Sequence, residues 1–119
     1  MNIVLGVTGS IAAYKAADIT SRLKKLGHNV DVILTENGSK IITALTLQTL
    51  SKNKVYMDMF EEITPTEVKH ISLAEKADLV LIAPATANII GKIAHGIADD
   101  FLSTVVMAAA NQAPVYIAP

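Results

Sequence analysis

The stretch 3-IVLGVTGSIAAYKAADITSRLKKLGHNVDVIL-34 decides the fold. It opens with a short β-branched run that ends at the turn Thr8-Gly9-Ser10, which predicts a strand buried on both faces. From Ala12 to Leu26 small and apolar residues recur in steps of three and four, which predicts an amphipathic helix that ends at Gly27. Asn29–Leu34 follows as a second strand. A helical crossover of this length joins parallel strands, so the stretch is predicted to be a right-handed βαβ unit.

The rest of the chain continues the alternation of strands and helices. Beyond the first unit the sequence predicts a helix at Gly38–Leu50, a strand at Val55–Met57, a loop at Asp58–Glu67, a strand at Leu79–Ala83 ended by Pro84, a helix at Ala87–Ile97, a helix from Asp99 or Asp100 to Ala110 and a strand at Pro114–Ala118. Such alternation indicates an α/β fold, in which helices cover both faces of a parallel sheet and make three layers. At 119 residues the chain is expected to form one domain.

Composition excludes several classes of protein. The chain is 51% hydrophobic and 18% charged, which excludes a disordered or collagen-like chain and leaves apolar surface for a partner. Its net charge of −1 gives no attraction for nucleic acid or for an anionic membrane. It contains no Cys, no cluster with metal-ligand spacing, and no apolar run near the roughly 18 residues of a membrane span. We therefore expect a cytoplasmic protein without nucleic-acid, membrane or metal partners.

The first strand-to-helix turn has residues that suit a phosphate. Gly9 lets the backbone approach a ligand closely, and the following helix N-terminus and the Ser10 hydroxyl offer hydrogen-bond donors. The pattern is not GxGxxG, because Ala12 takes the place of the third glycine, and only Thr35 with the adjacent Glu36 follows the second strand. A mononucleotide therefore fits better than a dinucleotide. A tight turn without a ligand explains the same residues.

A second candidate loop follows the strand at Leu79–Ala83. Loops at the carboxyl ends of parallel strands bind ligands, and Thr86, Asn88 and their backbone amides are neutral groups that suit a flavin ring edge or a phosphate. A helix N-cap at either residue explains them equally well. His70, at a loop boundary beside apolar neighbours, is the candidate proton carrier, although a lone His is more often packed or solvated.

Four motifs together resemble one protein family. They are Gly9–Lys15, His70–Leu73, Pro84–Asn88 and Gly91–Asp100. In this order they are similar to the homo-oligomeric flavin-containing cysteine decarboxylases, and within them to the flavin domain of bacterial phosphopantothenoylcysteine decarboxylases. The resemblance runs from Ile3 to Pro119. The family segment Pro-Ala-Ser-Ala-Asn-Thr differs here at two positions, since Thr86 replaces Ser and Ile89 replaces the final Thr.

The resemblance implies a Rossmann-like, flavodoxin-like fold in which residues 1–119 are a single FMN-binding domain. It also implies that FMN lies at a subunit contact of a homotrimer or dodecamer. His70 matches the active-site histidine of the family. The residues that the resemblance places against FMN are Gly9, Ser10, Ile11, Thr35, Thr86, Ala87, Asn88 and Ile89, with Ser103 and Thr104 as weaker candidates.

The implied activity is the FMN-dependent decarboxylation of phosphopantothenoylcysteine to phosphopantetheine in coenzyme A biosynthesis. In such enzymes FMN oxidises the cysteinyl side chain, CO2 leaves, and the reduced flavin returns the electrons, while His70 would act on the thiol as acid or base. Three alternatives stay open: an FMN-binding regulatory or interaction subunit, a decarboxylase of peptidyl cysteine, and a flavin prenyltransferase. Among the enzymes, the decarboxylase of coenzyme A biosynthesis is favoured by two segments, Ala12–Lys15 and Ala94–Asp100.

The family continues beyond the last predicted strand with Pro-x-Met-Asn-x-x-Met-Trp, whose Asn grips the substrate carboxylate, and later with a Cys that completes the reduction. Pro119 would be the first residue of that motif, and Asn111 does not match its Asn. These 119 residues are therefore expected to lack the substrate clamp and to keep FMN contacts better than turnover.

Overall fold

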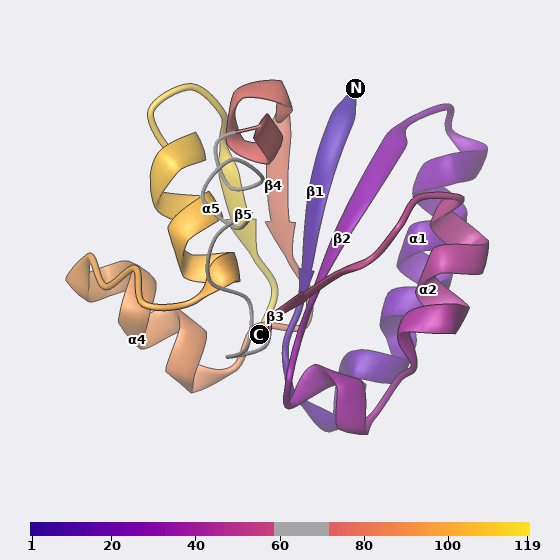
Figure 1. Cartoon of the computed structure of the whole chain (residues 1–119), viewed down its shortest axis with the longest axis horizontal. Helices are drawn as coiled ribbons and strands as arrows, with labels where there is room; N and C mark the ends of the chain where they lie inside the picture. The colour runs from indigo at the N-terminus through magenta and orange to yellow at the C-terminus, as the bar shows by residue number, and fades with distance from the viewer. Residues whose placement is uncertain (59–71) are drawn as a thin grey trace.

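Strands and helices alternate along the chain in the computed structural model, which describes residues 1–58 and 72–119 (Figure 1). The elements are β1 (Asn2–Val7), η1 (Ile11–Lys15), α1 (Ala16–Lys25), β2 (Asn29–Thr35), η2 (Gly38–Lys40), α2 (Ala44–Ser51), β3 (Tyr56–Asp58), β4 (Leu79–Ile82), α4 (Ala87–His95), α5 (Phe101–Ala109) and β5 (Val115–Ile117). Residues 72–76 are also helical. Of the loop predicted at 58–67, Asp58 ends β3 and the rest lies outside the described residues. Within those residues no helix is long and apolar enough to cross a membrane.

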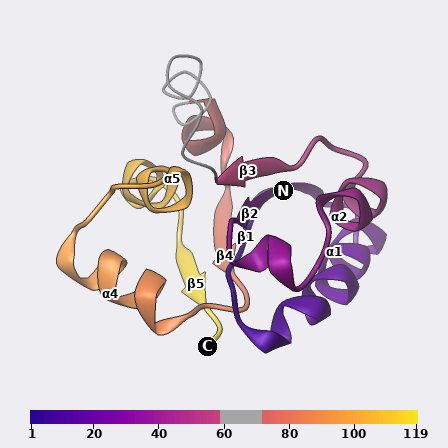
Figure 2. The same ribbon diagram turned by 60° about the horizontal axis from the view of Figure 1, so that its bottom comes forward.

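The five strands pair in parallel in the order β3-β2-β1-β4-β5 (Figure 2). β1 is the central strand, and the register places its Gly6 opposite Ile33 of β2 and Ile82 of β4. This order confirms the predicted Rossmann-like, flavodoxin-like α/β fold. The chain builds outward from β1 through β2 and β3, then returns to build β4 and β5 on the other side. The order therefore reverses between β1 and β4, and doubly wound sheets bind their ligands at such a point.

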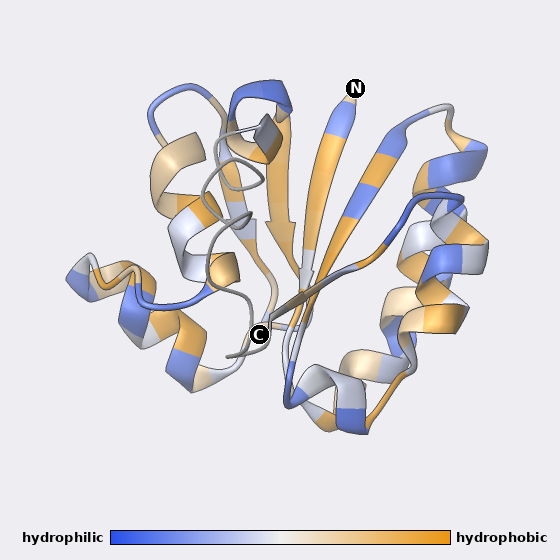
Figure 3. Cartoon of the chain, viewed as in Figure 1, coloured by the Kyte–Doolittle hydropathy of each residue, from blue (hydrophilic) through white to orange (hydrophobic). Residues whose placement is uncertain are grey.

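Helices cover both faces of the sheet, as predicted for three layers. α1 and α2 pack on one face over a core that includes Leu34 and Leu47. α4, α5 and residues 72–76 pack on the other face over a core that includes Ile33 and Leu102. Neighbouring strand residues thus face opposite cores, which explains the apolar runs in the sequence. Figure 3 shows mostly orange, apolar strands, with blue, hydrophilic segments on α1, α2 and α4.

Two predicted helices are each divided in the structure. The helix predicted from Ala12 begins as the 3-10 turn η1 before α1, and the helix predicted from Gly38 is divided into η2 and α2. Thr43 makes the second division, because its backbone is extended (φ −86°, ψ 148°) and its Oγ1 accepts the N–H of Thr46 at 3.2 Å. A short polar residue that caps a new helix therefore interrupts a pattern that is otherwise compatible with one helix.

Two helices end at glycines, and a third begins at an aspartate. Gly27, with φ +90°, ends α1 as predicted. Gly96, with φ +70°, ends α4 at His95, before the predicted Ile97, because glycine adopts a positive φ at little cost and closes the turn there. The N-cap of α5 is Asp100 rather than Asp99.

Candidate functional site

The loops that follow β1 and β4 are joined directly at the carboxyl edge of the sheet, beside the reversal of strand order. The Thr8 hydroxyl donates to the carbonyl oxygen of Pro84 at 2.7 Å and accepts the N–H of Thr86 at 3.0 Å. The backbone N–H of Thr8 also donates to Pro84, at 3.3 Å. Two segments that are far apart in the sequence are thereby held at one place on the sheet.

The loop after β1 carries Gly9, Ser10 and Ile11. Ser10 caps η1, since its Oγ accepts the N–H of Ala12 at 3.2 Å. Gly9 lies against the loop after β2, because a Cβ built on it would be 2.4 Å from the Cβ of Asn37. Ile11 is 83% exposed. The close approach of the two loops therefore requires glycine at position 9.

Thr35 ties the end of β2 to the end of β1. Its hydroxyl donates to the carbonyl oxygen of Val7 at 3.3 Å and accepts the N–H of Gly38 at 3.1 Å. Gly38 is itself confined, because a Cβ built on it would be 2.8 Å from the same Val7 oxygen. The loop after β2 therefore lies tightly against the end of β1.

The loop after β4 leads into α4. Thr86 has extended backbone and its Oγ1 accepts the N–H of Ile89 at 3.4 Å, which confirms the N-cap interpretation of this residue. Ala87 and Asn88 are exposed on the first turn, whereas the Ile89 side chain is buried in the core. The exposed side chains of this loop are therefore those of residues 87 and 88.

In the loops after β1 and β4, four backbone N–H groups have no hydrogen-bond acceptor within the described residues. They belong to Gly9, Ile11, Ala87 and Asn88. The first N–H groups of a helix have no partner in the helix itself and carry partial positive charge. Two loops therefore present backbone donors at one edge of the sheet, and this arrangement suits an anion or a ring rich in hydrogen-bond acceptors.

Ser103 and Thr104 lie on a different element, the first turn of α5. The buried Ser103 hydroxyl donates to Oδ1 of Asp100 at 2.5 Å, and the Thr104 hydroxyl donates to the Asp100 carbonyl at 2.6 Å. Leu102 beside them packs on Gly6 of β1, where a built Cβ would be 2.7 Å from the leucine Cδ1. Within the described residues no hydrogen bond joins either hydroxyl to the three loops.

A largely buried lysine holds the turn between α4 and α5. Lys92 is 18% exposed and pairs with Asp99 at 3.0 Å and with Asp100 at 2.7 Å. The hydrogen bond to Asp100 raises the pKa of Lys92, although burial opposes it. Burial raises the pKa of Asp100, but hydrogen bonds from Lys92 and Ser103 together lower it by more, so its pKa lies below the ordinary value. Both groups are therefore charged at neutral pH.

The predicted proton carrier, His70, lies outside the described residues. Of the other histidines, the Nδ1 of His28 is 3.2 Å from the N-terminal amine, and His95 ends α4. Neither belongs to the three loops. The part of the chain that the structure describes contains no group of three or more His, Cys, Asp or Glu that could hold a metal ion.

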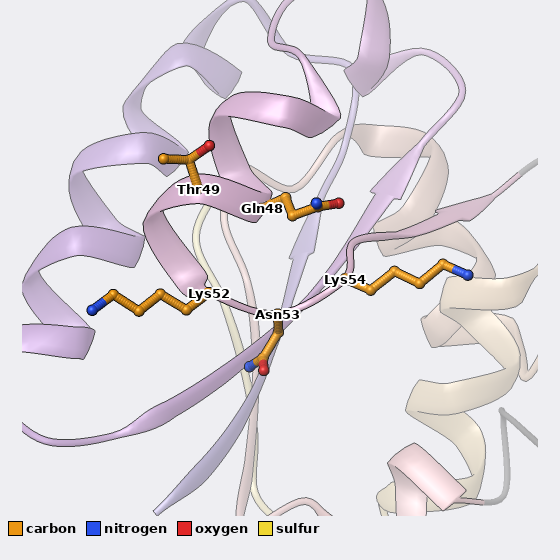
Figure 4. Close-up of a pocket in the computed structure, with 5 residues that line it drawn as sticks. All are labelled: Gln48, Thr49, Lys52, Asn53 and Lys54. Carbon is orange, nitrogen blue, oxygen red and sulfur yellow. The ribbon is translucent and has the colours of Figure 1, made fainter.

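An open hollow lies at the opposite edge of the sheet (Figure 4). It is lined by Gln48, Thr49, Lys52, Asn53 and Lys54. Asn53 donates to the Val30 carbonyl at 2.7 Å, which places the hollow at the amino end of β2. Lys52 and Lys54 point away from each other, and the carboxyl end of α2 carries partial negative charge. This hollow therefore does not present converging donors, and the loops at the other edge remain the candidate site.

Comparison with known proteins identifies the family of this chain. The model of the family described as Flavoprotein matches residues 1–119. The chain belongs to the flavoprotein family. The coenzyme A biosynthesis bifunctional protein CoaBC of Bacillus subtilis strain 168 is 52% identical to this flavoprotein over 118 residues, which are 99% of the chain and 29% of that protein. The probable phosphopantothenoylcysteine decarboxylase of Streptococcus mutans is 48% identical over 117 residues, which are 98% of the chain and 65% of that protein.

Solved structures show the same fold. The crystal structure of the FMN-dependent cysteine decarboxylase SpaF matches with a TM-score of 0.84 and 26% identity, over 98% of this flavoprotein and 66% of the SpaF chain. The flavoprotein thus spans less than two thirds of the length of each of these three proteins.

Three residues at the site are not singled out by the sequence. Thr8 is visible only as a hydroxyl residue directly after a buried strand, and Asn37 and Gly38 stand in a stretch that predicts the start of a helix. Their importance comes from contacts between loops: Thr8 with the loop after β4, and the other two with the loop after β1. A local sequence pattern gives no information about contacts between loops that are far apart in the chain.

Proposed function

We propose that this flavoprotein is the FMN-binding domain of a phosphopantothenoylcysteine decarboxylase, with residues 1–119 as one domain. That decarboxylase releases CO2 from phosphopantothenoylcysteine in the cytoplasm and yields phosphopantetheine for coenzyme A biosynthesis. The decisive observation is the pair of donor-bearing loops that Thr8 joins where the strand order reverses. The name of the relative at 48% identity supports the substrate, the name of the relative at 52% identity supports coenzyme A biosynthesis, and the name of SpaF supports FMN.

The residues of the site fit FMN. The phosphate suits the Ser10 hydroxyl and the unpartnered N–H groups of Gly9 and Ile11, because several donors then share a dianion without a basic side chain. The uncharged flavin ring suits the exposed backbone N–H groups and the side-chain amide at the start of α4. The proposed set that holds FMN is Gly9, Ser10, Ile11, Thr35, Thr86, Ala87, Asn88 and Ile89, with Ser103 and Thr104 beside it.

The proposed chemistry divides between the cofactor and His70. FMN, when bound, supplies a reversible two-electron acceptor, so that a cysteinyl group can lose CO2 without net oxidation. His70 takes the proton from the Sγ–H of the substrate and later returns it, because an imidazole exchanges protons near neutral pH. The loops keep the cofactor fixed while this proton moves.

The flavoprotein is proposed to act as a homotrimer or as a dodecamer of trimers. Support comes from exposed apolar side chains next to the site, namely Ile11, Tyr14, Ile41 and Leu45. Ile11 and Tyr14 lie in η1, Ile41 is the C-cap of η2 and Leu45 lies at the start of α2. These segments follow β1 and β2 at the same edge of the sheet (Figures 1 and 2). Burial of such side chains between subunits would remove apolar surface from water.

Binding of FMN to the purified chain is the first test. Titration with FMN is expected to quench flavin fluorescence and to give a yellow complex, whereas riboflavin, which lacks the phosphate, is expected to bind roughly 10-fold more weakly or worse. A chain that leaves FMN fluorescence unchanged contradicts the proposal.

Replacement of His70 by Asn tests the catalytic part of the proposal. In a full-length form that includes the substrate clamp, we expect H70N to keep the flavin absorbance and to lower the rate of CO2 release by about 10²–10⁴-fold, the usual contribution of a general acid or base. Release is measured with phosphopantothenoylcysteine and, as control, with its serine analogue, which has no thiol. Wild-type rates in H70N would remove His70 from the mechanism, and turnover of the serine analogue would contradict the thiol chemistry.

A further inference from the structure

Thr8 is a buried residue whose hydroxyl forms both of its hydrogen bonds to the loop after β4. Its side chain is 2% exposed. The hydroxyl donates to the carbonyl oxygen of Pro84 at 2.7 Å and accepts the N–H of Thr86 at 3.0 Å. Neither partner belongs to the strand or the loop that carries Thr8. The hydroxyl therefore connects two loops rather than stabilising one element.

The same residue orients the donors on both sides of this connection. On one side it fixes Thr86, the N-cap that begins α4 and whose Oγ1 accepts the N–H of Ile89 at 3.4 Å. On the other side its own carbonyl accepts the N–H of Ser10 at 2.9 Å, just before η1. The unpartnered N–H groups of both loops are thus linked through one residue: the Thr8 hydroxyl contacts the loop after β4, and the Thr8 carbonyl contacts the loop after β1.

We propose that Thr8 is a positioning residue of the cofactor site, whose hydroxyl sets the spacing between the loop for the FMN phosphate and the loop for the flavin ring. This rests on the proposed function, which supplies FMN as the ligand. The side chain of valine has nearly the shape of threonine but neither donates nor accepts a hydrogen bond. Thr8→Val therefore leaves the Thr86 N–H without its partner, and leaves the Pro84 carbonyl with only the backbone N–H of residue 8 at 3.3 Å. Thr8→Ser keeps the hydroxyl and removes only a methyl group.

Thr20 provides a matched control. It is also fully buried, and its hydroxyl donates to the carbonyl oxygen of Ala16 at 2.8 Å, one turn back within α1. Thr20→Val therefore removes a buried hydroxyl bond of similar length that joins no loops. A loss of FMN affinity caused by lower stability alone would appear in both valine variants.

The experiment compares FMN dissociation constants and thermal midpoints of the apoprotein for T8V, T8S, T20V and the wild type. T8V is expected to weaken FMN roughly 10-fold or more, the loss that follows from unpaired buried groups, while T8S and T20V stay within about 3-fold of the wild type. The visible spectrum of bound flavin is expected to change in T8V only. Wild-type affinity for FMN in T8V overturns the proposal. So does a loss of FMN affinity in T20V that equals the loss in T8V, if the two variants have the same thermal midpoint.

Amide hydrogen exchange separates this proposal from the proposed function, since it needs no cofactor. In the apoprotein the Thr86 amide is expected to exchange about 10-fold faster or more in T8V, with unchanged exchange in the core of β1. If the wild type does not bind FMN, the proposed function fails, and an unchanged Thr86 amide in T8V then overturns the role of Thr8 as well. If T8V does not fold, Thr8→Cys replaces it, since a thiol forms weaker hydrogen bonds than a hydroxyl. A T8C variant that loses more FMN affinity than T8S supports the proposal. A T8C affinity for FMN between those of T8S and the wild type overturns it.

Discussion

Gly9 and Gly91 are the same residue type in opposite surroundings. A Cβ on Gly9 would be 2.4 Å from the Cβ of Asn37 and 3.0 Å from its carbonyl carbon, atoms that cannot move without the backbone. A Cβ on Gly91, inside α4, would meet nothing within 4 Å. The first glycine is therefore fixed by the contact between loops, and the second is only a weak helix former.

We expect Gly9→Ala to destabilise the fold by about 1–3 kcal/mol, since an inserted methyl group forces loops apart in a packed region. Gly91→Ala is expected to stabilise it by about 0.5–1 kcal/mol, because alanine loses less conformational freedom in a helix. Urea unfolding of both variants checks this. Equal effects of the two substitutions would show that the loop contact does not constrain position 9.

At the scale of elements, the turn between α4 and α5 depends on charge. Lys92 of α4 reaches Oδ2 of Asp100, whose Oδ1 accepts the N–H of Ser103 at 2.8 Å and so caps α5. Because the pKa of Asp100 is lowered, its contribution to stability is present above its ordinary value of 3.8 and is lost as the pH falls through the lower folded-state value. The pKa of Lys92 is raised, so its contribution to stability is present below its ordinary value of 10.5 and is lost as the pH rises through the higher folded-state value.

Asp100→Asn tests this window, since asparagine also caps helices but carries no charge. The wild type is expected to exceed D100N in thermal midpoint from about pH 4 to about pH 10, with the difference shrinking below and above that range. Asp18→Asn is the control, because Asp18 forms an exposed pair with Arg22 at 2.8 Å, and such pairs contribute little. A difference between wild type and D100N that stays constant down to pH 2 would contradict the assignment.

The sequence predicts elements where periodicity dominates and fails where a single side chain intervenes. The first strand, helix and second strand follow from the spacing of apolar residues between Ile3 and Leu34, and the parallel pairing of β1 with β2 confirms them. Thr43 divides a helix through its own hydroxyl, and Gly96 ends another through a positive φ. Both residue types also occur inside helices, so their effect is visible only in the backbone.

The sequence predicts which loops form the candidate site, but not the contact that joins them. Parallel strands bring their carboxyl ends to one edge, so the sequence indicates that the loops at Gly9 and Thr86 share it. The bond that joins them, through Thr8, depends on tertiary contacts between segments 76 residues apart. The placement of His70 remains a prediction.

For the molecule as a whole, the surface beside the site is the part expected to associate. Tyr14 is 60% exposed and Leu45 is 71% exposed, whereas Leu26, at 72%, lies at the other end of α1. We expect the double variant Tyr14→Asp and Leu45→Asp to reduce the mass in solution to that of the 12.6 kDa chain. Leu26→Asp is expected to leave the oligomer intact, because the charge lies away from the proposed contact.

Light scattering coupled to size-exclusion chromatography measures these masses. A wild type that is already a monomer at high concentration contradicts the oligomer, and dissociation by L26D alone would place the contact at the wrong end of the molecule.

The outer strands of the sheet, β3 and β5, are three residues each, whereas the inner β1 and β2 have six and seven. Free backbone donors and acceptors along a sheet edge are a template on which other chains can add as strands. With such short edges, crowded copies of this protein have little template for fibril growth, even though the sheet itself is made of apolar, β-branched sequence. Within the part of the chain that the structure describes, the short outermost strands thus limit the edge on which another chain could add as a strand.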